Sequence, residues 1–519
     1  MTKDMNPGFN IGDSLSTRAY LNPNKEAVFD VEKHQRFTFT QLNDRANQCN
    51  AALKSLGLQH GDRVALLAYN GHEFLESFFG PAKSGMVLMP LNWRLTADEL
   101  AFILMDGGAK ALIFNADFSP AVAEIRARGD AGSDIENWIF IGDQTPDFAL
   151  DYEAVLASNS ATEPAARAGE DDNLFIMYTS GTTGNPKGVV HTHKTVFWAL
   201  LTLANTAEIH LADKYMILLP LFHVGALTPM ICSVYKGNTL VILRNFDPQK
   251  AWSLIETEQI NTTLAVPAML AFMLQVPDFQ RFDWTSLRSI TSGAAPLPVT
   301  TINAYMELGI EVHQVYGMTE TCGPACLIGP DDARRNIGST GKCFFHTQVR
   351  IADTAGNELP RGEAGEVQVR GPHNMLEYWN RPKATAETVI DGWLHTGDMA
   401  VMDEEGFVTI QDRIKDMIIS GGENIYPAEI ENVLLSHPGI SDAAVIGQDS
   451  PKWGESPLAV IVKAEPSVTE AQVLEYCSGK LARFKLPKSA VFVDQIPRNP
   501  SGKILKRVLR EQYPGPAQE

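Results

Sequence analysis

The first part of the chain alternates short apolar runs with amphipathic stretches of helical period. Apolar runs predict buried strands at 63–69, 86–89 and 110–114, and helical spacing predicts helices at 41–56 and 73–84. Thr96 precedes an acidic first turn and is expected to cap a further helix. The same alternation recurs between residues 215 and 291. Strands that alternate with helices form parallel sheets covered by those helices, so the pattern predicts an α/β fold.

The pattern changes near residue 353. Short strands joined by turns are expected at 349–352, 365–370 and 406–411, which predicts a small β-rich subdomain. After Arg413, helices and strands alternate over about 100 residues, which is a common size for an α+β domain. We therefore expect a large N-terminal domain of helix-covered sheets at 1–413, a hinge at 414–415 and a small C-terminal domain at 416–519.

The loop Tyr178-Thr-Ser-Gly-Thr-Thr-Gly-Asn-Pro-Lys-Gly188 lies between two predicted strands. Its glycines, hydroxyl groups and amides can converge on one group of anionic oxygens, and Lys187 adds a positive charge. Triphosphate is the ligand that this composition favours. The common nucleotide P-loop is excluded, because that motif needs Ser or Thr after the lysine and a helix after the loop. Taken alone, the loop is also compatible with a plain surface loop.

Composition narrows the class of protein. A chain of 519 residues exceeds one hydrophobic core, and 44% hydrophobic with 20% charged residues is typical of a globular enzyme. The net charge of −19 disfavours nucleic acid as a partner and weakens attraction to anionic membranes. The polar segment Met1–Asn10 and the scattered cysteines predict a cytoplasmic protein. Cys322 and Cys326 lack two further zinc ligands at suitable spacing, so we expect them to pack in a loop.

A second motif, Tyr316-Gly-Met-Thr-Glu320, follows a predicted strand at 310–315. The carboxyl ends of strands are where open α/β sheets bind ligands. Gly317 allows a close approach of the backbone, Tyr316 can stack on a base, and Glu320 can hold Mg²⁺. An exposed turn explains the motif equally well when it is considered alone.

Three further motifs follow along the chain. Asp398 ends a predicted turn in Gly392-Trp-Leu-His-Thr-Gly-Asp398 and can accept hydrogen bonds from ribose hydroxyls. Arg413 in Gln411-Asp-Arg-Ile-Lys-Asp416 can contact ribose or phosphate. Lys503 in Ser501-Gly-Lys503 can deliver an ammonium group into a cleft. Taken alone, Asp398 is also compatible with a turn cap, and Lys503 with a solvated lysine.

All five motifs, in this order, resemble the adenylate-forming superfamily of acyl-CoA synthetases, luciferases and peptide-synthetase adenylation domains. The resemblance covers nearly the whole chain, and the segments 415–429 and 503–513 are most similar to bacterial long-chain fatty-acid CoA ligases. It implies that a carboxylic acid attacks ATP to form acyl-AMP and pyrophosphate, and that CoA then takes the acyl group. It also implies a mobile C-terminal domain that swings about Lys415 between the two half-reactions.

The resemblance implies a role for each matching residue. Catalysis is assigned to Lys503, Thr319, Glu320 and His223. ATP binding is assigned to Thr179, Ser180, Gly181, Thr182, Thr183, Gly184, Lys187, Tyr316, Gly317, Met318, Thr319, Glu320, Asp398, Arg413 and Lys503. Mg²⁺ is assigned to Glu320 and Thr179. CoA binding is assigned to Ser420, Gly421, Gly422, Trp453 and Phe484. Leu486 replaces an arginine that grips the CoA phosphates in some relatives, so Lys485 or Lys488 is considered for that contact.

The acyl pocket is assigned to His223, Val224, Thr228, Gly293, Ala294, Ala295 and Gly317. His223 stands where amino-acid-activating relatives place an aspartate, which disfavours an α-amino acid. We expect a medium- or long-chain fatty acid, with an aryl acid such as a cinnamate or benzoate as the alternative. A luciferase-like oxygenase and a non-catalytic sensor on the same fold are weaker alternatives. Membrane contact is not supported, because Thr195–Leu200 carries no basic residue, and we expect a homodimer.

Overall fold

The computed structural model describes residues 9–129, 132–165, 167–179, 186–295, 297–329, 331–414, 416–420, 423–450, 453–478, 480–481, 483–498 and 504–515, without the side chains at 423, 424 and 484. Over these residues it confirms the predicted α/β fold. The chain forms two large sheets covered by helices, a smaller β-rich sheet and a C-terminal α+β unit.

One large sheet is built from the first predicted strands. Its order is β19-β9-β8-β4-β3-β5-β6-β7, and pairing is parallel from β8 through β7. The bounds are β3 (Arg63–Leu67), β4 (Val87–Pro90), β5 (Ala109–Asn115), β6 (Asn137–Ile141), β7 (Leu150–Asp151), β8 (Asn173–Thr179), β9 (Lys187–Thr192) and β19 (Glu377–Tyr378). β8 and β9 are antiparallel, so the glycine-rich loop closes a hairpin at the edge of the parallel strands.

The other large sheet has the order β16-β15-β14-β13-β12-β10-β11-β1-β2. Its bounds are β1 (Glu26–Asp30), β2 (Gln35–Thr38), β10 (Lys214–Ile217), β11 (Thr239–Ile242), β12 (Thr262–Ala265), β13 (Ser289–Ser292), β14 (Glu311–Tyr316), β15 (Cys326–Leu327) and β16 (Lys342–Cys343). The six strands from β1 to β14 are parallel, whereas β2, β15 and β16 are added antiparallel at the two ends.

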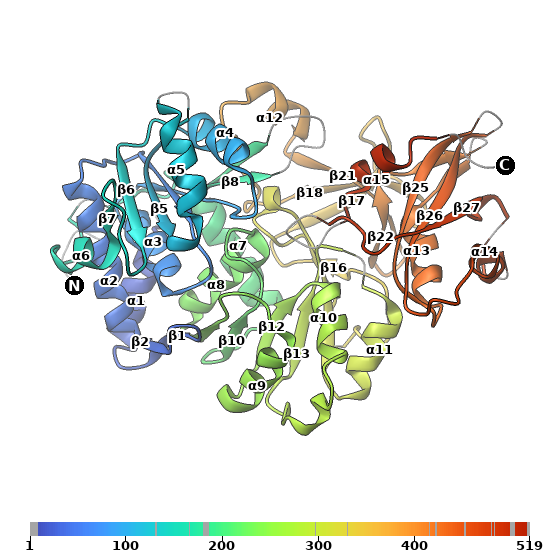
Figure 1. Cartoon of the computed structure of the whole chain (residues 1–519), viewed down its shortest axis with the longest axis horizontal. Helices are drawn as coiled ribbons and strands as arrows, with labels where there is room; N and C mark the ends of the chain where they lie inside the picture. The colour runs from blue at the N-terminus through green and yellow to red at the C-terminus, as the bar shows by residue number, and fades with distance from the viewer. Residues whose placement is uncertain are drawn as a thin grey trace.

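Helices separate and cover these sheets in layers (Figure 1). A central layer packs between the sheets in one shared core and comprises α1 (Gly12–Leu21), α2 (Phe39–Ser55), α3 (His72–Lys83), α7 (His193–Thr206) and α8 (Val224–Lys236). One outer layer comprises α4 (Ala97–Gly107) and α5 (Ser119–Ala127). The other comprises α9 (Pro248–Glu258), α10 (Pro267–Leu274) and α11 (Val299–Glu307). The short helices α6 (Tyr152–Ala157) and α12 (Pro382–Thr388) lie in connections.

Local sequence signals explain several helix starts. The Thr96 side chain accepts a hydrogen bond from Glu99 N, and Thr96 N donates one to the Glu99 carboxylate, as the predicted cap requires. Thr38 and Gln41 form the same reciprocal cap on α2, so that helix begins two residues earlier than periodicity alone predicts.

The β-rich sheet has the order β17-β18-β21-β20, and β22 also pairs with β21. Its strands are β17 (Gln348–Ala352), β18 (Ala364–Arg370), β20 (Val389–Ile390), β21 (Trp393–Met402) and β22 (Val408–Arg413). The prediction that Asp398 ends a turn is wrong. Asp398 lies inside β21, directly opposite Arg413 on β22. Buried and half-buried residues alternate along β21, as is typical of a strand. Gly397 made this segment look like a turn in the sequence.

The C-terminal unit lies at the opposite end of the long axis from the first helices (Figure 1). It comprises β23 (Ile418–Ser420), β24 (Glu423–Ile425), β25 (Ile440–Ser450), β26 (Gly454–Lys463), β27 (Ser489–Phe492), α13 (Pro427–Leu435), α14 (Glu470–Ser478) and α15 (Lys506–Gln512). Its sheet has its own core on each face, against α13 and α14 on one side and α15 on the other. The exact domain boundary and the hinge at Lys415, which lies outside the described residues, stay predictions.

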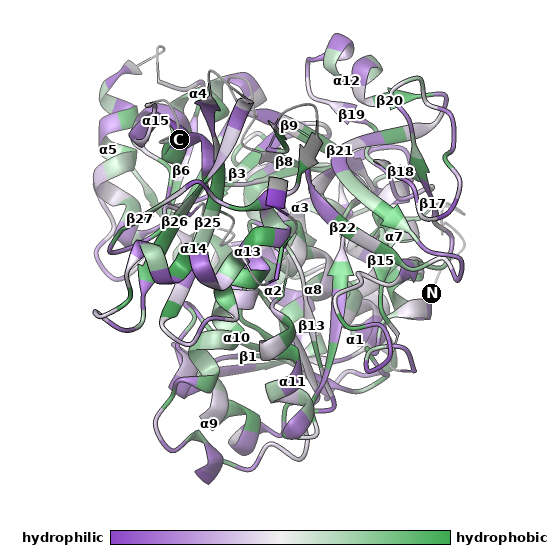
Figure 2. Cartoon of the chain, turned by 90° about the vertical axis from the view of Figure 1, so that its right-hand side faces the viewer, coloured by the Kyte–Doolittle hydropathy of each residue, from purple (hydrophilic) through white to green (hydrophobic). Residues whose placement is uncertain are grey.

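Figure 2 shows hydrophobic residues concentrated in the strands, for example β25 and β26, with hydrophilic residues in the loops around them. In the part of the chain that the structure describes, no helix combines the length and apolar character needed to cross a membrane.

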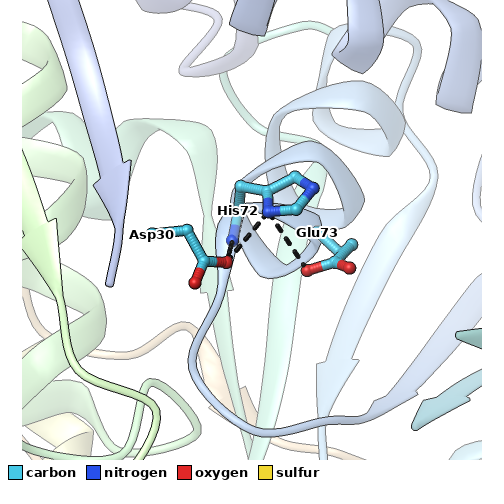
Figure 3. A group of neighbouring side chains, drawn as sticks. All are labelled: Asp30, His72 and Glu73. Atoms are coloured by element: carbon cyan, nitrogen blue, oxygen red, sulfur yellow. Dashed lines mark hydrogen bonds and ion pairs between the residues drawn. The ribbon is translucent and has the colours of Figure 1, made fainter. Parts of the chain in front are cut away.

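A buried charged cluster joins β1 to α3 (Figure 3). His72 Nδ1 lies 2.9 Å from Asp30 Oδ2 and 3.5 Å from Glu73 Oε2, and Lys33 forms an ion pair with Glu73. The same Asp30 oxygen accepts a hydrogen bond from His72 N, in the first turn of α3. This spacing also suits a metal ion. Because each of these side chains already has a charged partner in the protein, we interpret the cluster as a structural anchor for α3.

Candidate active site

The segment 316–320 leaves β14 and enters a short 3-10 helix, η4 (Thr319–Thr321). A Cβ atom at position 317 would lie 1.5 Å from the carbonyl oxygen of Gly323. Glycine is therefore required at 317 by the protein's own turn, in addition to any need for a ligand to approach. The turn places Thr319 and Glu320 directly beyond the carboxyl end of the parallel strand β14.

Three of the predicted nucleotide residues meet beside this turn. The Tyr316 hydroxyl donates to Asp398 Oδ2 at 2.7 Å, and Arg413 Nε lies 2.6 Å from Asp398 Oδ1. Asp398 is only 5% exposed, so its negative charge is stabilised mainly by these two partners. Burial, followed by the charge of Asp398, raises the pKa of Tyr316, which keeps the phenol a hydrogen-bond donor.

Glu320 and Tyr378 form a second group of contacts, in addition to that of Tyr316, Asp398 and Arg413. Glu320 Oε1 accepts a hydrogen bond of 2.7 Å from the hydroxyl of Tyr378, and burial raises the pKa of the Glu320 carboxyl. Lys187 Nζ lies 4.9 Å from the centre of the Tyr378 ring. Thr179 is directly opposite Lys187 on the β8–β9 hairpin. The Lys187 end of the glycine-rich loop therefore approaches Glu320 through Tyr378, and Thr179 at the other end lies opposite Lys187. Ser180, Gly181, Thr182, Thr183 and Gly184 lie outside the described residues.

Sequence reasoning missed Tyr378, because no motif surrounds it. Its position follows from pairing in the sheet, since β19 adds to β9 with Tyr378 opposite Val189. This register carries Tyr378 from a distant part of the chain to the glycine-rich hairpin.

Two buried histidines, also missed, hold the backbone of η4. His191 Nε2 donates to the Thr319 carbonyl oxygen at 2.8 Å, and His373 Nδ1 donates to the Thr321 carbonyl oxygen at 2.9 Å. Burial lowers the pKa of each histidine to about 4, so both are neutral at physiological pH. They fix the direction in which Thr319 and Glu320 leave the strand without adding charge to the site.

The predicted acyl-pocket residues of α8 lie against the same turn. Thr228 Oγ1 donates to the Cys322 carbonyl oxygen at 2.8 Å, and Val224 lies beside Gly323. His223 immediately precedes α8, and burial, followed by the charge of Arg94, lowers its pKa to about 4. Among the described residues, its buried Nε2 has no hydrogen-bond partner. A neutral imidazole with one unsatisfied nitrogen suits a site that receives a polar substrate atom.

The three small residues that follow β13, namely Gly293, Ala294 and Ala295, lie in different environments. A Cβ atom at Gly293 would lie 2.5 Å from the Val315 carbonyl oxygen, so close packing of β13 on β14 requires this glycine. Ala294 is exposed and adopts a left-handed conformation with φ of 69°, and Ala295 is half-buried. The structure thus places Gly293 next to the end of β14 and Ala294 at the surface.

The predicted CoA residues fall on the C-terminal unit. Ser420 pairs with Gly454, which places it next to Trp453, whose exposed fraction is 42%. Gly421, Gly422, Lys503, Lys415 and the side chain of Phe484 lie outside the described residues. Lys485 Nζ lies 2.7 Å from Glu429 Oε2, so this lysine is already paired, whereas Lys488 is exposed.

Comparison with known proteins agrees with this arrangement. Residues 15–379 match the AMP-binding enzyme family, and residues 429–503 match the AMP-binding enzyme C-terminal domain. The chain is 46% identical over 504 residues to the long-chain-fatty-acid–CoA ligase FadD13 of Mycobacterium tuberculosis, covering 97% of this chain and 98% of the relative.

Two solved structures share the fold over almost the full length. The anthranilate CoA ligase AuaEII in complex with anthranoyl-AMP matches with a TM-score of 0.92 at 30% identity, covering 98% of each chain. The o-succinylbenzoate CoA synthetase of Bacillus subtilis, bound to its acyl-adenylate intermediate, matches with a TM-score of 0.86 at 33% identity, covering 96% of this chain and 98% of that one. The family match and the coverage together show that the chain belongs to the AMP-binding enzyme family.

Proposed function

We propose that the chain is an ATP-dependent acyl-CoA ligase, which activates a carboxylic acid as acyl-AMP with release of pyrophosphate and then transfers the acyl group to CoA. The observation that carries the proposal is the convergence at the carboxyl end of β14. There, the Tyr316–Asp398–Arg413 group lies at the first residue of the segment 316–320, and the contact of Glu320 with Tyr378 lies at its last residue. The first group suits a ribose, and the second suits phosphates with a metal ion.

In the first half-reaction, the buried Asp398 carboxylate would accept hydrogen bonds from the ribose hydroxyls, held in place by Arg413. Lys187 and the glycine-rich loop would hold the β- and γ-phosphates as pyrophosphate leaves. Thr319 would donate to the oxygen atoms at the reacting centre. Charge builds on the phosphoryl oxygens in this reaction, so positioning and electrostatic stabilisation supply most of the catalysis.

The donor set of Glu320 and Thr179 fits Mg²⁺, because a carboxylate and a hydroxyl are hard oxygen ligands. Tyr378 occupies Oε1 of Glu320, and the carboxylate still offers its second oxygen. When bound, Mg²⁺ would neutralise charge on the phosphates. The chain's own part is to keep Glu320 ionised and oriented despite its burial.

In the second half-reaction, the C-terminal unit would rotate about Lys415, remove Lys503 from the cleft and present the face that contains Ser420 and Trp453. The short Ser420–Gly454 pairing brings these two positions together. The glycines at 421 and 422 would leave room for the pantetheine arm. Lys503 would bridge the substrate carboxylate and the α-phosphate before the rotation.

For the acid, we propose a medium- or long-chain fatty acid. The relative that is 46% identical over almost the whole chain is named a long-chain-fatty-acid–CoA ligase, which supports this choice. An aryl acid is the second candidate, supported by the anthranilate ligase with a TM-score of 0.92. Neutral His223 in the predicted pocket offers no charge partner for an α-ammonium group, which disfavours amino acids.

The test is acid-dependent exchange of pyrophosphate into ATP, followed by CoA-dependent release of AMP, over a panel of fatty and aryl acids. We expect Asp398→Asn to reduce exchange by about 100-fold, because it leaves the half-buried Arg413 charge without its carboxylate. Asp353→Asn, at an exposed turn, is the matched control. Exchange with no acid of the panel would reject the ligase and favour a sensor, and light emission with a luciferin would favour an oxygenase.

Cytoplasmic location and a homodimer stay predictions. Light scattering of the purified protein would measure the second directly.

A further inference from the structure

The structure pairs two cysteines that lie far apart in the sequence. Cys326 on β15 is directly opposite Cys343 on β16 in antiparallel register. The sequence instead draws attention to Cys322, which is only four positions from Cys326. Cys322 packs in the core between the two large sheets, whereas Cys326 packs in the core of the β-rich sheet. The two sequence neighbours therefore lie in separate environments.

The hydrogen bonds define the type of pair that Cys326 and Cys343 form. Phe344 N donates to the Ala325 carbonyl oxygen at 3.1 Å, so the hydrogen bond of the ladder joins the two residues that flank the cysteines. Cys326 and Cys343 then form the non-hydrogen-bonded pair, in which Cα atoms lie about 4.5 Å apart and side chains share one face. Disulfides need Cα separations of roughly 4.4 to 6.8 Å. Register and spacing both permit a bond between the two sulfur atoms.

The two thiols differ in access to solvent. Among the six cysteines, Cys343 is exposed and the other five are buried. Burial, followed by the neighbouring Cys343, raises the pKa of the Cys326 thiol. An oxidant therefore meets Cys343 first, and Cys326 is placed to react with the oxidised sulfur afterwards.

The pair also bridges two parts of the candidate active site. Cys326 lies opposite Tyr316 on its other side, and Ala325 N donates to the Tyr316 carbonyl oxygen at 3.0 Å. Two residues before Cys343, Gly341 O accepts a hydrogen bond of 2.8 Å from Val408 N at the start of β22. β22 ends at Arg413. A covalent link between β15 and β16 thus joins the strand that carries Tyr316 to the strand that carries Arg413.

We propose that Cys343 and Cys326 form a peroxide-sensitive dithiol that closes to an intrachain disulfide and slows adenylation. The Cys343 thiolate attacks hydrogen peroxide, the O–O bond of the peroxide breaks, and Cys343 becomes a sulfenic acid. The hydroxide that leaves takes up the proton lost when the thiol ionised and becomes water. The Cys326 sulfur then attacks the Cys343 sulfur, the S–O bond breaks, and a second water leaves with the thiol proton. Two electrons pass from the thiols to the peroxide. The second step is the slow one, because Cys326 is buried.

The experiment treats the reduced full-length chain with hydrogen peroxide, blocks remaining thiols with iodoacetamide and maps linked peptides by mass spectrometry. We expect one linkage, Cys326 to Cys343, in the wild type and in the control Cys322→Ser, and its loss on treatment with dithiothreitol. In Cys326→Ala, Cys343 should stop at the sulfenic acid and be trapped by dimedone. Linkage to Cys322, linkage between two chains, or over-oxidation of Cys343 without linkage would overturn the dithiol.

The coupling to adenylation rests on the proposed function and has its own readout. Peroxide should cause a loss of pyrophosphate exchange that dithiothreitol restores in the wild type and in Cys322→Ser, while Cys343→Ser keeps its rate. A linked chain with unchanged exchange would overturn the coupling. A reduced chain that exchanges with no acid would instead reject the proposed function, and the peptide map would still decide the disulfide.

Discussion

Lys506 Nζ on α15 lies 3.6 Å from Asp412 Oδ2 on β22, so the last helix of the chain is tied to the strand that precedes the predicted hinge. Lys506 is only 9% exposed and also lies 3.0 Å from Glu431 Oε1 on α13. Asp412 in turn accepts a hydrogen bond from Ala428 N at the start of α13. This buried contact connects the C-terminal unit to the β-rich sheet, one residue from Arg413 of the candidate nucleotide site.

Removing the Lys506 charge should loosen the C-terminal unit. In Lys506→Met, Asp412 and Glu431 remain buried without their cation, and breaking a buried ion pair in this way costs about 3–5 kcal/mol. Hydrogen exchange measured by mass spectrometry should speed up in peptides from α13 and α15. Arg507→Met is the matched control, because Arg507 is exposed and pairs only at the surface with Glu511. Equal exchange in the two variants would contradict the anchoring role.

Tyr378→Phe should weaken adenylation and shift its pH dependence. The Tyr378 hydroxyl lowers the pKa of the Glu320 carboxyl, which burial raises, so its loss raises that pKa further. Because Glu320 acts as a carboxylate, the acid limb of the pyrophosphate-exchange profile should move to higher pH by about one unit. At neutral pH, kcat/KM should fall roughly 10- to 100-fold, the usual effect of losing a hydrogen bond to a charged group. Tyr476→Phe is the control, because Tyr476 lies on α14, far from the site, and it should leave the pH profile unchanged. An unshifted acid limb in Tyr378→Phe would show that the Tyr378 hydroxyl does not control the pKa of Glu320.

Acidification should destabilise the fold through His193. Its Nδ1 accepts a hydrogen bond of 3.0 Å from Ile11 N, and burial lowers the pKa of His193 to about 4. Between pH 6.5 and 4 the unfolded chain binds a proton that the folded chain does not, so stability is full above this window and is lost as the pH falls through it. The loss from this site amounts to roughly 3 kcal/mol. As the pH falls from 6.5 to 4, the thermal midpoint of the wild type should decrease, and that of the control His34→Gln, whose histidine is exposed, should decrease equally. The thermal midpoint of His193→Gln should decrease less. Identical pH slopes in all three proteins would remove His193 as the cause.

Lys503→Ala should separate the two half-reactions. The proposed bridge between carboxylate and α-phosphate acts only in adenylation, so acid-dependent exchange should be abolished. Thioester formation from supplied acyl-adenylate and CoA should largely persist. Lys488→Ala, which removes an exposed lysine of the C-terminal unit, is the control for a general charge effect. Equal loss of both half-reactions in Lys503→Ala would count against rotation about Lys415.

The sequence by itself determined the elements and the motifs, because both depend on neighbouring residues. Period placed α2 and α3 to within two residues, and the Thr96 cap placed the start of α4. The glycine-rich loop and the Tyr316–Glu320 segment were recognisable from their composition. Turn chemistry misled where Gly397 made a strand resemble a turn, because Asp398 is held in β21 by its pairing with Arg413.

Only the tertiary structure decided which distant residues meet. Cys326 faces Cys343 because β15 and β16 pair in one sheet in a single register, whereas Tyr378 reaches Glu320 and His191 reaches Thr319 from one large sheet to the turn that follows β14 of the other. Such a register depends on burying whole faces of strands and helices together, and a shift by one residue would turn every side chain to the opposite face. No local sequence pattern specifies the register between remote strands. The sequence therefore predicted which kinds of residue form the site, and the tertiary structure was needed to show how they are arranged.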